Sequence, residues 1–241
     1  MKRIIFSIAI VTFFATSSSF AASPSYAEGT MLNVFAPSGL KLRAFPNLNG
    51  DVLEIVQYGD QVKVLNTFDF SSEKAERIDW IDGHWILVEF GGISGYLFDG
   101  YLSAMPFPSS RDEMLMDGYS YAYTIGQYME QHHQIETVVD SSETSLSYIL
   151  ADGTFVEMKV DTDYWIVEVE TPTYQAHEVL NLMRSMIPDR KSRSLFEKSL
   201  LFNEDEKGEI SEIKVKLGDE AIIRKEKNGN IRIKASGHAG C

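Results

Sequence analysis

The chain has 241 residues, of which 22 are basic and 35 acidic, so its formal net charge is −13 at pH 7. This excess of negative charge argues against nucleic acid and anionic membrane surfaces as partners, because both would repel the protein. Cys241 is the only cysteine, which excludes an intramolecular disulfide. A chain of this length suits one or two domains that are stabilised by packing.

The N-terminus has the features of a secretory signal. Lys2 and Arg3 supply positive charge, and an uninterrupted apolar run from Ile4 to Phe14 follows them. The run is shorter than the ~20 residues needed to cross a bilayer, so no membrane span is predicted. We expect a secreted or periplasmic protein.

Small residues follow the apolar run and predict where the signal is removed. Ser25-Tyr26-Ala27 fits the small–x–small rule for cleavage best, which gives a signal peptide over residues 1–27. Cleavage after Ala21 or Ala22 is the alternative.

Residues 31–105 are predicted to form a small all-β barrel. Apolar residues alternate with polar ones in short runs, as in Leu40 and Leu42, and Gly-containing turns separate the runs. Residues 66–82 are longer and more polar than a tight turn, and are interpreted as an excursion between two strands. Pro106 and Pro108 with two following serines place a domain boundary there.

Residues 111–235 are predicted to form an α+β domain with an antiparallel sheet. The sequences Ala151-Asp152-Gly153-Thr154 and Lys227-Asn228-Gly229-Asn230 are typical of hairpin turns. Residues 236–241 are expected to be a loose tail. Apolar periodicity predicts helices at 111–132, from Pro172 onward and at 192–202, and strands at 135–139, 146–150, 156–160, 164–170, 213–217 and 231–233.

Several short motifs occur in order within the first region. They are Ser38-Gly39-Leu40-Lys41-Leu42-Arg43 followed by Pro46, then Tyr58-Gly59-Asp60, Trp85-Ile86-Leu87-Val88, Gly95-Tyr96-Leu97 and Tyr101-Leu102. Together they resemble the bacterial SH3-like (SH3b) family, over roughly a third of the chain. The resemblance implies an SH3-like barrel that binds peptides or wall polymers and performs no chemistry. The region after Arg111 shows no such resemblance.

The resemblance also implies a ligand groove lined by aromatic side chains, which suit glycan, aliphatic and cationic groups. Trp85 is also a candidate for the barrel core, and Trp80 fits the groove and the core equally well. Four carboxylates in the same segment favour an amine-bearing, cationic ligand. The carboxylates are Glu73, Glu76, Asp79 and Asp82, and the candidate ligand-binding residues are Phe68, Phe70, Trp80, Trp85 and Tyr96.

No catalytic residue, metal site or cofactor is predicted. A papain-like peptidase needs its Cys before its His, but every His precedes Cys241. Glu130 and His133 have the spacing of a carboxylate-bridged metal site, which requires a second such motif that the chain lacks. Gly91-Gly92-Ile93-Ser94-Gly95 only approximates a serine nucleophile elbow.

The leading hypothesis is an exported, non-catalytic binding or adaptor protein for a peptide, a peptidoglycan fragment or an envelope protein. The alternative is an envelope enzyme whose active site lies in residues 111–241, a region rich in tyrosine. An inhibitor, suggested only by the acidity, is a third hypothesis.

Overall fold

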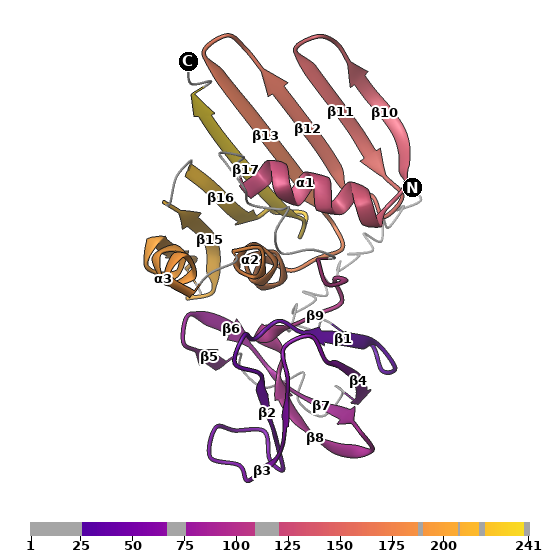
Figure 1. Cartoon of the computed structure of the whole chain (residues 1–241), viewed down its shortest axis with the longest axis vertical. Helices are drawn as coiled ribbons and strands as arrows, with labels where there is room; N and C mark the ends of the chain where they lie inside the picture. The colour runs from indigo at the N-terminus through magenta and orange to yellow at the C-terminus, as the bar shows by residue number, and fades with distance from the viewer. Residues whose placement is uncertain are drawn as a thin grey trace, which may run out of the picture.

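The structure, a computed structural model, describes residues 26–66, 76–108, 121–187, 190–206, 208–216 and 220–238. A strand-rich barrel is followed by a domain with an eight-stranded antiparallel sheet and a few helices (Figure 1). The fold class predicted from the sequence is therefore confirmed.

The barrel is a seven-stranded antiparallel sheet with the order β3-β2-β8-β7-β4-β1-β9. Alternation places Leu42, Val64, Val88 and Leu97 inside, where each is fully buried. The elements are β1 (Met31–Val34), β2 (Leu40–Arg43), β3 (Val52–Val56), β4 (Gln61–Asn66), β7 (Trp85–Phe90), β8 (Ile93–Phe98), the 3-10 helix η1 (Asp99–Tyr101) and β9 (Leu102–Ser103).

Gly95 lets β8 pass close to β2. A Cβ atom at this position would lie 2.8 Å from Leu42 Cγ and 2.9 Å from the Arg43 carbonyl oxygen. Both distances are too short for a real side chain, so the glycine of the Gly95-Tyr96-Leu97 motif is required by the packing of the two strands.

The segment 66–82, which was expected to be an excursion between two strands, contains regular secondary structure in part. Its second half is a two-stranded hairpin of β5 (Glu76–Ile78) and β6 (Ile81–Gly83). Asp79 in the turn has φ +57°, the only positive φ of a non-glycine residue that the structure describes. The segment 67–75 lies outside the described residues.

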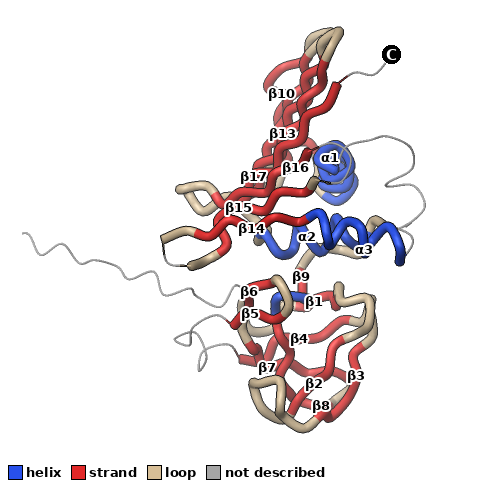
Figure 2. The backbone as a smooth tube through the Cα atoms, turned by 90° about the vertical axis from the view of Figure 1, so that its left-hand side faces the viewer, coloured by secondary structure: helices blue, strands red, loops and turns tan. Residues whose placement is uncertain are grey.

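The second sheet has the order β10-β11-β12-β13-β17-β16-β15-β14, and all of its pairings are antiparallel. Three helices cover one face (Figure 2), and the other face is open. The elements are α1 (Tyr121–His132), β10 (Ile135–Ser141), β11 (Ser145–Leu150), β12 (Phe155–Val160), β13 (Tyr164–Thr171), α2 (Ala176–Ser185), α3 (Arg190–Ser199), β14 (Leu200–Glu204), β15 (Ile210–Val215), β16 (Glu220–Lys225) and β17 (Ile231–His238).

Two predicted helix boundaries were wrong. Helix α2 begins at Ala176 rather than Pro172, because Glu178 accepts a hydrogen bond from the Gln175 backbone N–H (2.9 Å) and fixes the first turn there. The helix predicted at 192–202 ends at Ser199. The next residues form β14, in which Phe202 pairs with Ile213 of β15.

The prediction of a loose tail from residue 236 was wrong for its first residues. Strand β17 continues to His238, and Ser236 lies between Ile166 of β13 and Glu220 of β16. The first ten residues of the helix predicted at 111–132, the residue Leu217 and residues 239–241 lie outside the described part of the chain.

The barrel and the second domain pack against each other. Phe35 and Met105, which flank barrel strands, belong to the hydrophobic core of the second domain. Trp80 packs against both cores. Among the described residues, none of the helices has the length and apolar character needed to span a membrane.

Candidate functional site

Of the five aromatic residues predicted to bind a ligand, the structure describes Trp80, Trp85 and Tyr96, and only Trp85 lines the cleft described below. Trp85 is buried in the barrel core, with 7% exposure, and its Nε1 donates to Glu76 at 2.9 Å. Tyr96 is partly buried against the same core. Phe68 and Phe70 lie outside the described residues.

Trp80 lies where the barrel meets the second domain. Its ring stacks on Phe202 of β14, with centroids 5.9 Å apart, and meets Tyr101 edge-on at 6.4 Å. The guanidinium carbon of Arg184 in α2 lies 5.9 Å from the same ring. Of the two interpretations drawn from the sequence, the core one holds in part, because Trp80 packs against the barrel core and also joins it to the core of the second domain.

The acidic side chains of the 66–82 segment are engaged within the protein. Besides the contact between Glu76 and Trp85, Asp79 accepts a hydrogen bond from the Tyr101 hydroxyl at 3.0 Å. Asp82 pairs with Arg77 at 2.6 Å. These contacts leave little basis for the expected cationic ligand at this segment; Glu73 lies outside the described residues.

A group of buried hydrogen bonds, called here the polar seam, joins the barrel to α2. One oxygen of Glu178, a residue with 2% exposure, accepts hydrogen bonds from the Ser103 hydroxyl (2.7 Å) and the Ala104 backbone N–H (3.0 Å). Asn181, one turn later, donates to the Gly100 carbonyl oxygen at 2.8 Å. Together these bonds fix α2 across η1 and β9.

Ionisable groups lie buried beside this seam. Burial raises the pKa of Asp99 to about 7, and lowers the pKa of His84. The two side chains are 3.9 Å apart, but these shifts favour the neutral form of both, so we do not treat them as an ion pair. Tyr26 donates its hydroxyl to the Leu102 carbonyl oxygen (3.3 Å) and lies 3.5 Å from His177 Nε2.

A cleft of about 850 Å³ opens next to the seam, between the barrel and helices α2 and α3. The buried rings of Trp85, Phe98 and Tyr101 line it from the barrel core. The turn at residues 36–39 forms another part of its wall, where Gly39 has φ +73°. Figures 1 and 2 show α2 and α3 on the barrel side of the second sheet, which explains why both domains contribute.

The charged residues of this cleft were missed by the sequence analysis. Of its five basic residues, three come from the helices and two from β2, regions that are far apart in the sequence. A local count of charge over residues 184–198 would have indicated the helical part, since basic residues outnumber acidic ones there. The basic lining residues are Lys41, Arg43, Arg184, Arg190 and Arg193, and the acidic ones are Asp79 and Glu197.

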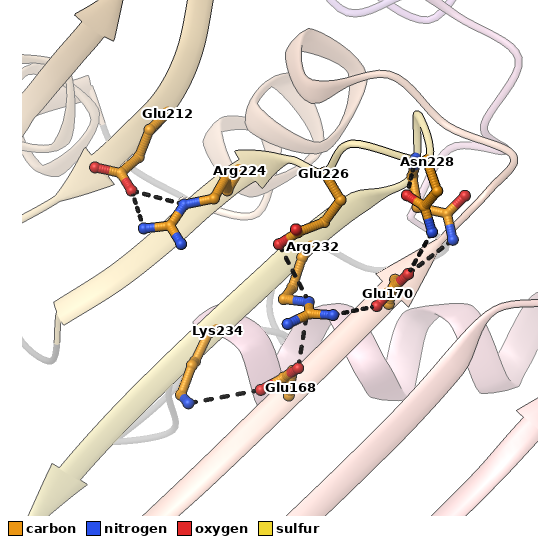
Figure 3. A network of polar contacts seen from close by, with 9 residues as sticks. Glu168, Glu170, Glu212, Arg224, Glu226, Asn228, Arg232 and Lys234 are labelled. Carbon is orange, nitrogen blue, oxygen red and sulfur yellow. Dashed lines mark hydrogen bonds and ion pairs between the residues drawn. The ribbon is translucent and has the colours of Figure 1, made fainter.

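The open face of the second sheet is charged but internally compensated (Figure 3). Arg232 is the centre of this network and contacts Glu170 at 2.7 Å, Glu168 at 3.3 Å and Glu226 at 3.4 Å. Hydrogen bonding to Arg232 lowers the pKa of Glu170. Glu168 and Glu170 alternate with the buried Val167 and Val169 and face away from the core, and their partners make this face a poor candidate for a ligand site.

The residues considered for metal binding do not converge. Glu130 accepts a hydrogen bond from Tyr148 at 3.2 Å, whereas His133 lies 3.0 Å from the Tyr174 hydroxyl and 3.5 Å from Asp152. Burial raises the pKa of Tyr174 to about 12, which keeps its hydroxyl protonated and does not suit a nucleophile. No group of three or more His, Cys, Asp or Glu side chains able to hold a metal occurs among the described residues.

Comparison with known proteins gives one match. Residues 38–103 match the family model described as a bacterial SH3 domain. No curated protein and no solved structure matches the chain. The matched range begins at the motif Ser38-Gly39-Leu40 and ends in β9, so it covers β2 to β9 of the seven-stranded sheet and the β5–β6 hairpin. The motif order, the seven-stranded barrel and this match together identify residues 38–103 as a bacterial SH3 domain.

Proposed function

We propose that this protein is an exported, non-catalytic binding or adaptor protein whose bacterial SH3 domain engages a peptide, a peptidoglycan fragment or an envelope protein. The observation that carries the proposal is the cleft beside the barrel. Its volume of about 850 Å³ falls within the ~300–1,000 Å³ typical of ligand pockets. Aromatic rings and charged groups together give it both packing and polar recognition.

The second domain supports this role by completing the cleft. Glu178 and Asn181 hold α2 against the barrel, and α3 follows α2 in the chain. The adaptor hypothesis therefore assigns the second domain a wall of the binding site. Of the aromatic residues behind the alternative enzyme hypothesis, Tyr128 and Tyr148 are buried in the core, which does not favour a pocket at these two positions, whereas Tyr164 is exposed.

A substitution that fills the cleft tests the proposal. Ser194 in α3 lines the cleft, and Leu195, its neighbour, is exposed and does not. We expect Ser194→Trp to weaken binding to purified peptidoglycan and to soluble muropeptides by at least about tenfold, which corresponds to a few well-formed contacts. Leu195→Trp is the matched control. Co-sedimentation and calorimetric titration are the measurements, and equal binding by both variants would refute the proposal.

A further inference from the structure

We propose that the cleft binds a peptide through a free carboxylate, so that the ligand is anionic. This assignment rests on the proposed binding function and specifies the chemistry of its ligand. It also reverses the cationic ligand expected from the sequence, because the carboxylates behind that expectation are engaged within the protein where they are described.

The charge of the cleft is opposite to that of the chain. Five basic and two acidic side chains line it, a net formal charge of +3, whereas the whole chain carries 22 basic and 35 acidic residues. A concave site with low-dielectric walls concentrates such a field and attracts ions of the opposite sign. An anion therefore enters this cleft more readily than other parts of so acidic a protein.

The two acidic residues of the cleft have partners inside the protein. Glu197 accepts a hydrogen bond from Arg184 Nε at 2.6 Å, and Asp79 accepts one from the Tyr101 hydroxyl. Arg43 donates to the Gly50 carbonyl oxygen at 2.7 Å, which fixes its position and keeps its charge. Glu197 therefore offsets Arg184, and the four other basic side chains outnumber Asp79, which leaves the net formal charge of +3.

Two basic residues are left for a ligand. Lys41 and Arg190 are exposed, and within the part of the chain that the structure describes neither makes a hydrogen bond or an ion pair. Lys41 comes from β2 of the barrel and Arg190 from the first turn of α3, so the two domains each supply one cation. A guanidinium binds a carboxylate through two parallel hydrogen bonds, and an ammonium adds a point charge.

Apolar groups next to these cations favour a peptide over a simple anion. Leu48 lines the cleft and is 54% exposed, and the rings of Trp85, Phe98 and Tyr101 form part of the same lining. Side chains of this kind bury apolar parts of a ligand, which inorganic anions lack. A short peptide with a free carboxylate offers both chemistries in the available volume.

The test compares one ligand in two charge states. A muramyl tetrapeptide with free carboxylates and the same compound with its carboxylates amidated are titrated into the full exported chain at low salt. We expect the free form to bind at least about tenfold more tightly, as for charge-assisted hydrogen bonds. Arg190→Ala and Lys41→Ala should each weaken binding of the free form severalfold, and added salt should do the same.

Matched controls remove one positive charge elsewhere. Lys198→Ala lies on the same helix as Arg190, and Lys63→Ala lies on barrel strand β4; both residues are exposed and outside the cleft. Neither control should change the affinity. Equal affinity for the two forms would overturn the carboxylate assignment while leaving the binding function standing. Binding of neither form would overturn both.

Discussion

Asp99 shows how one buried side chain can make the stability of the protein depend on pH. It is 2% exposed in η1, and its Oδ1 accepts the His84 backbone N–H at 2.6 Å. Burial is the largest cause of its raised pKa, and the nearby Glu178 raises the pKa further. Burial, Glu178 and Asp99 in turn raise the pKa of Tyr26. The carboxyl group is therefore best accommodated in the folded protein when it is protonated.

We expect Asp99→Asn to remove part of this pH dependence. The folded pKa of about 7 lies above the unfolded value of 3.8, so the protonated form stabilises the fold at low pH and this stability is lost as pH rises from about 4 through 7. An amide keeps the acceptor for the His84 N–H and does not titrate. The free energy of unfolding of the variant should increase relative to that of the wild type as pH rises, by at most about 4 kcal/mol.

Urea unfolding at pH 4.5, 6 and 8 measures this difference. Asp51→Asn changes an exposed carboxylate of the same barrel and serves as the control, because this variant keeps Asp99 and should keep the pH profile of the wild type. Parallel pH profiles for wild type and Asp99→Asn would show that Asp99 titrates normally in the folded protein.

At the scale of elements, helix α2 couples the two domains through Glu178. The carboxylate caps its own helix at Gln175 and binds Ser103 and Ala104 of the barrel side. One side chain therefore determines both where the helix begins and where the barrel docks. Gln175 is not a usual N-cap residue, so the sequence favoured a helix start at Pro172, and the barrel contacts join residues about 75 positions apart, which local patterns do not reveal.

We expect Glu178→Ala to uncouple the domains. The change removes the acceptor of the buried Ser103 hydroxyl and of the partly buried Ala104 and Gln175 backbone N–H groups, at a cost of about 3–5 kcal/mol. Scanning calorimetry should show the single transition of the wild type broaden or split into two. Glu178→Gln is the graded control, because its amide oxygen can still accept from Ser103 and Ala104. A single, unshifted transition for Glu178→Ala would contradict the role given to this residue.

At the scale of the whole molecule, local patterns predicted the fold and missed the site. Alternation at Leu40 and Leu42 and the Asp152-Gly153 and Asn228-Gly229 turns depend on neighbouring residues, and the barrel and the hairpins follow from them. The cleft forms where residues of α3 and β2 face each other. Contacts between residues far apart in the sequence determine this arrangement. Trp80 illustrates the limit, because an aromatic residue at a domain junction has the same local sequence context as one in a groove.

The burial of Tyr26 has a consequence for how the chain is processed. This ring is 7% exposed and belongs to the barrel core, with its hydroxyl between Leu102 and His177. A signal peptidase that cut after Ala27 would discard the ring and leave a cavity at the domain junction. A cut after Ala22 would retain it. Of the cleavage sites that the sequence allows, the packing therefore favours those upstream of Tyr26, after Ala21 or Ala22.

We accordingly predict that the exported protein begins at Ser23, as N-terminal sequencing or intact mass would show. A recombinant chain that begins at Glu28 should melt roughly 10 °C below one that begins at Ser23, since the loss of a buried aromatic side chain costs about 3–5 kcal/mol. Tyr26→Phe in the longer chain should recover most of the stability, because it keeps the ring. A mature N-terminus at Glu28 with an unchanged melting temperature would contradict this. If the expected leader is removed, the position of the cut therefore decides whether the junction keeps the ring of Tyr26.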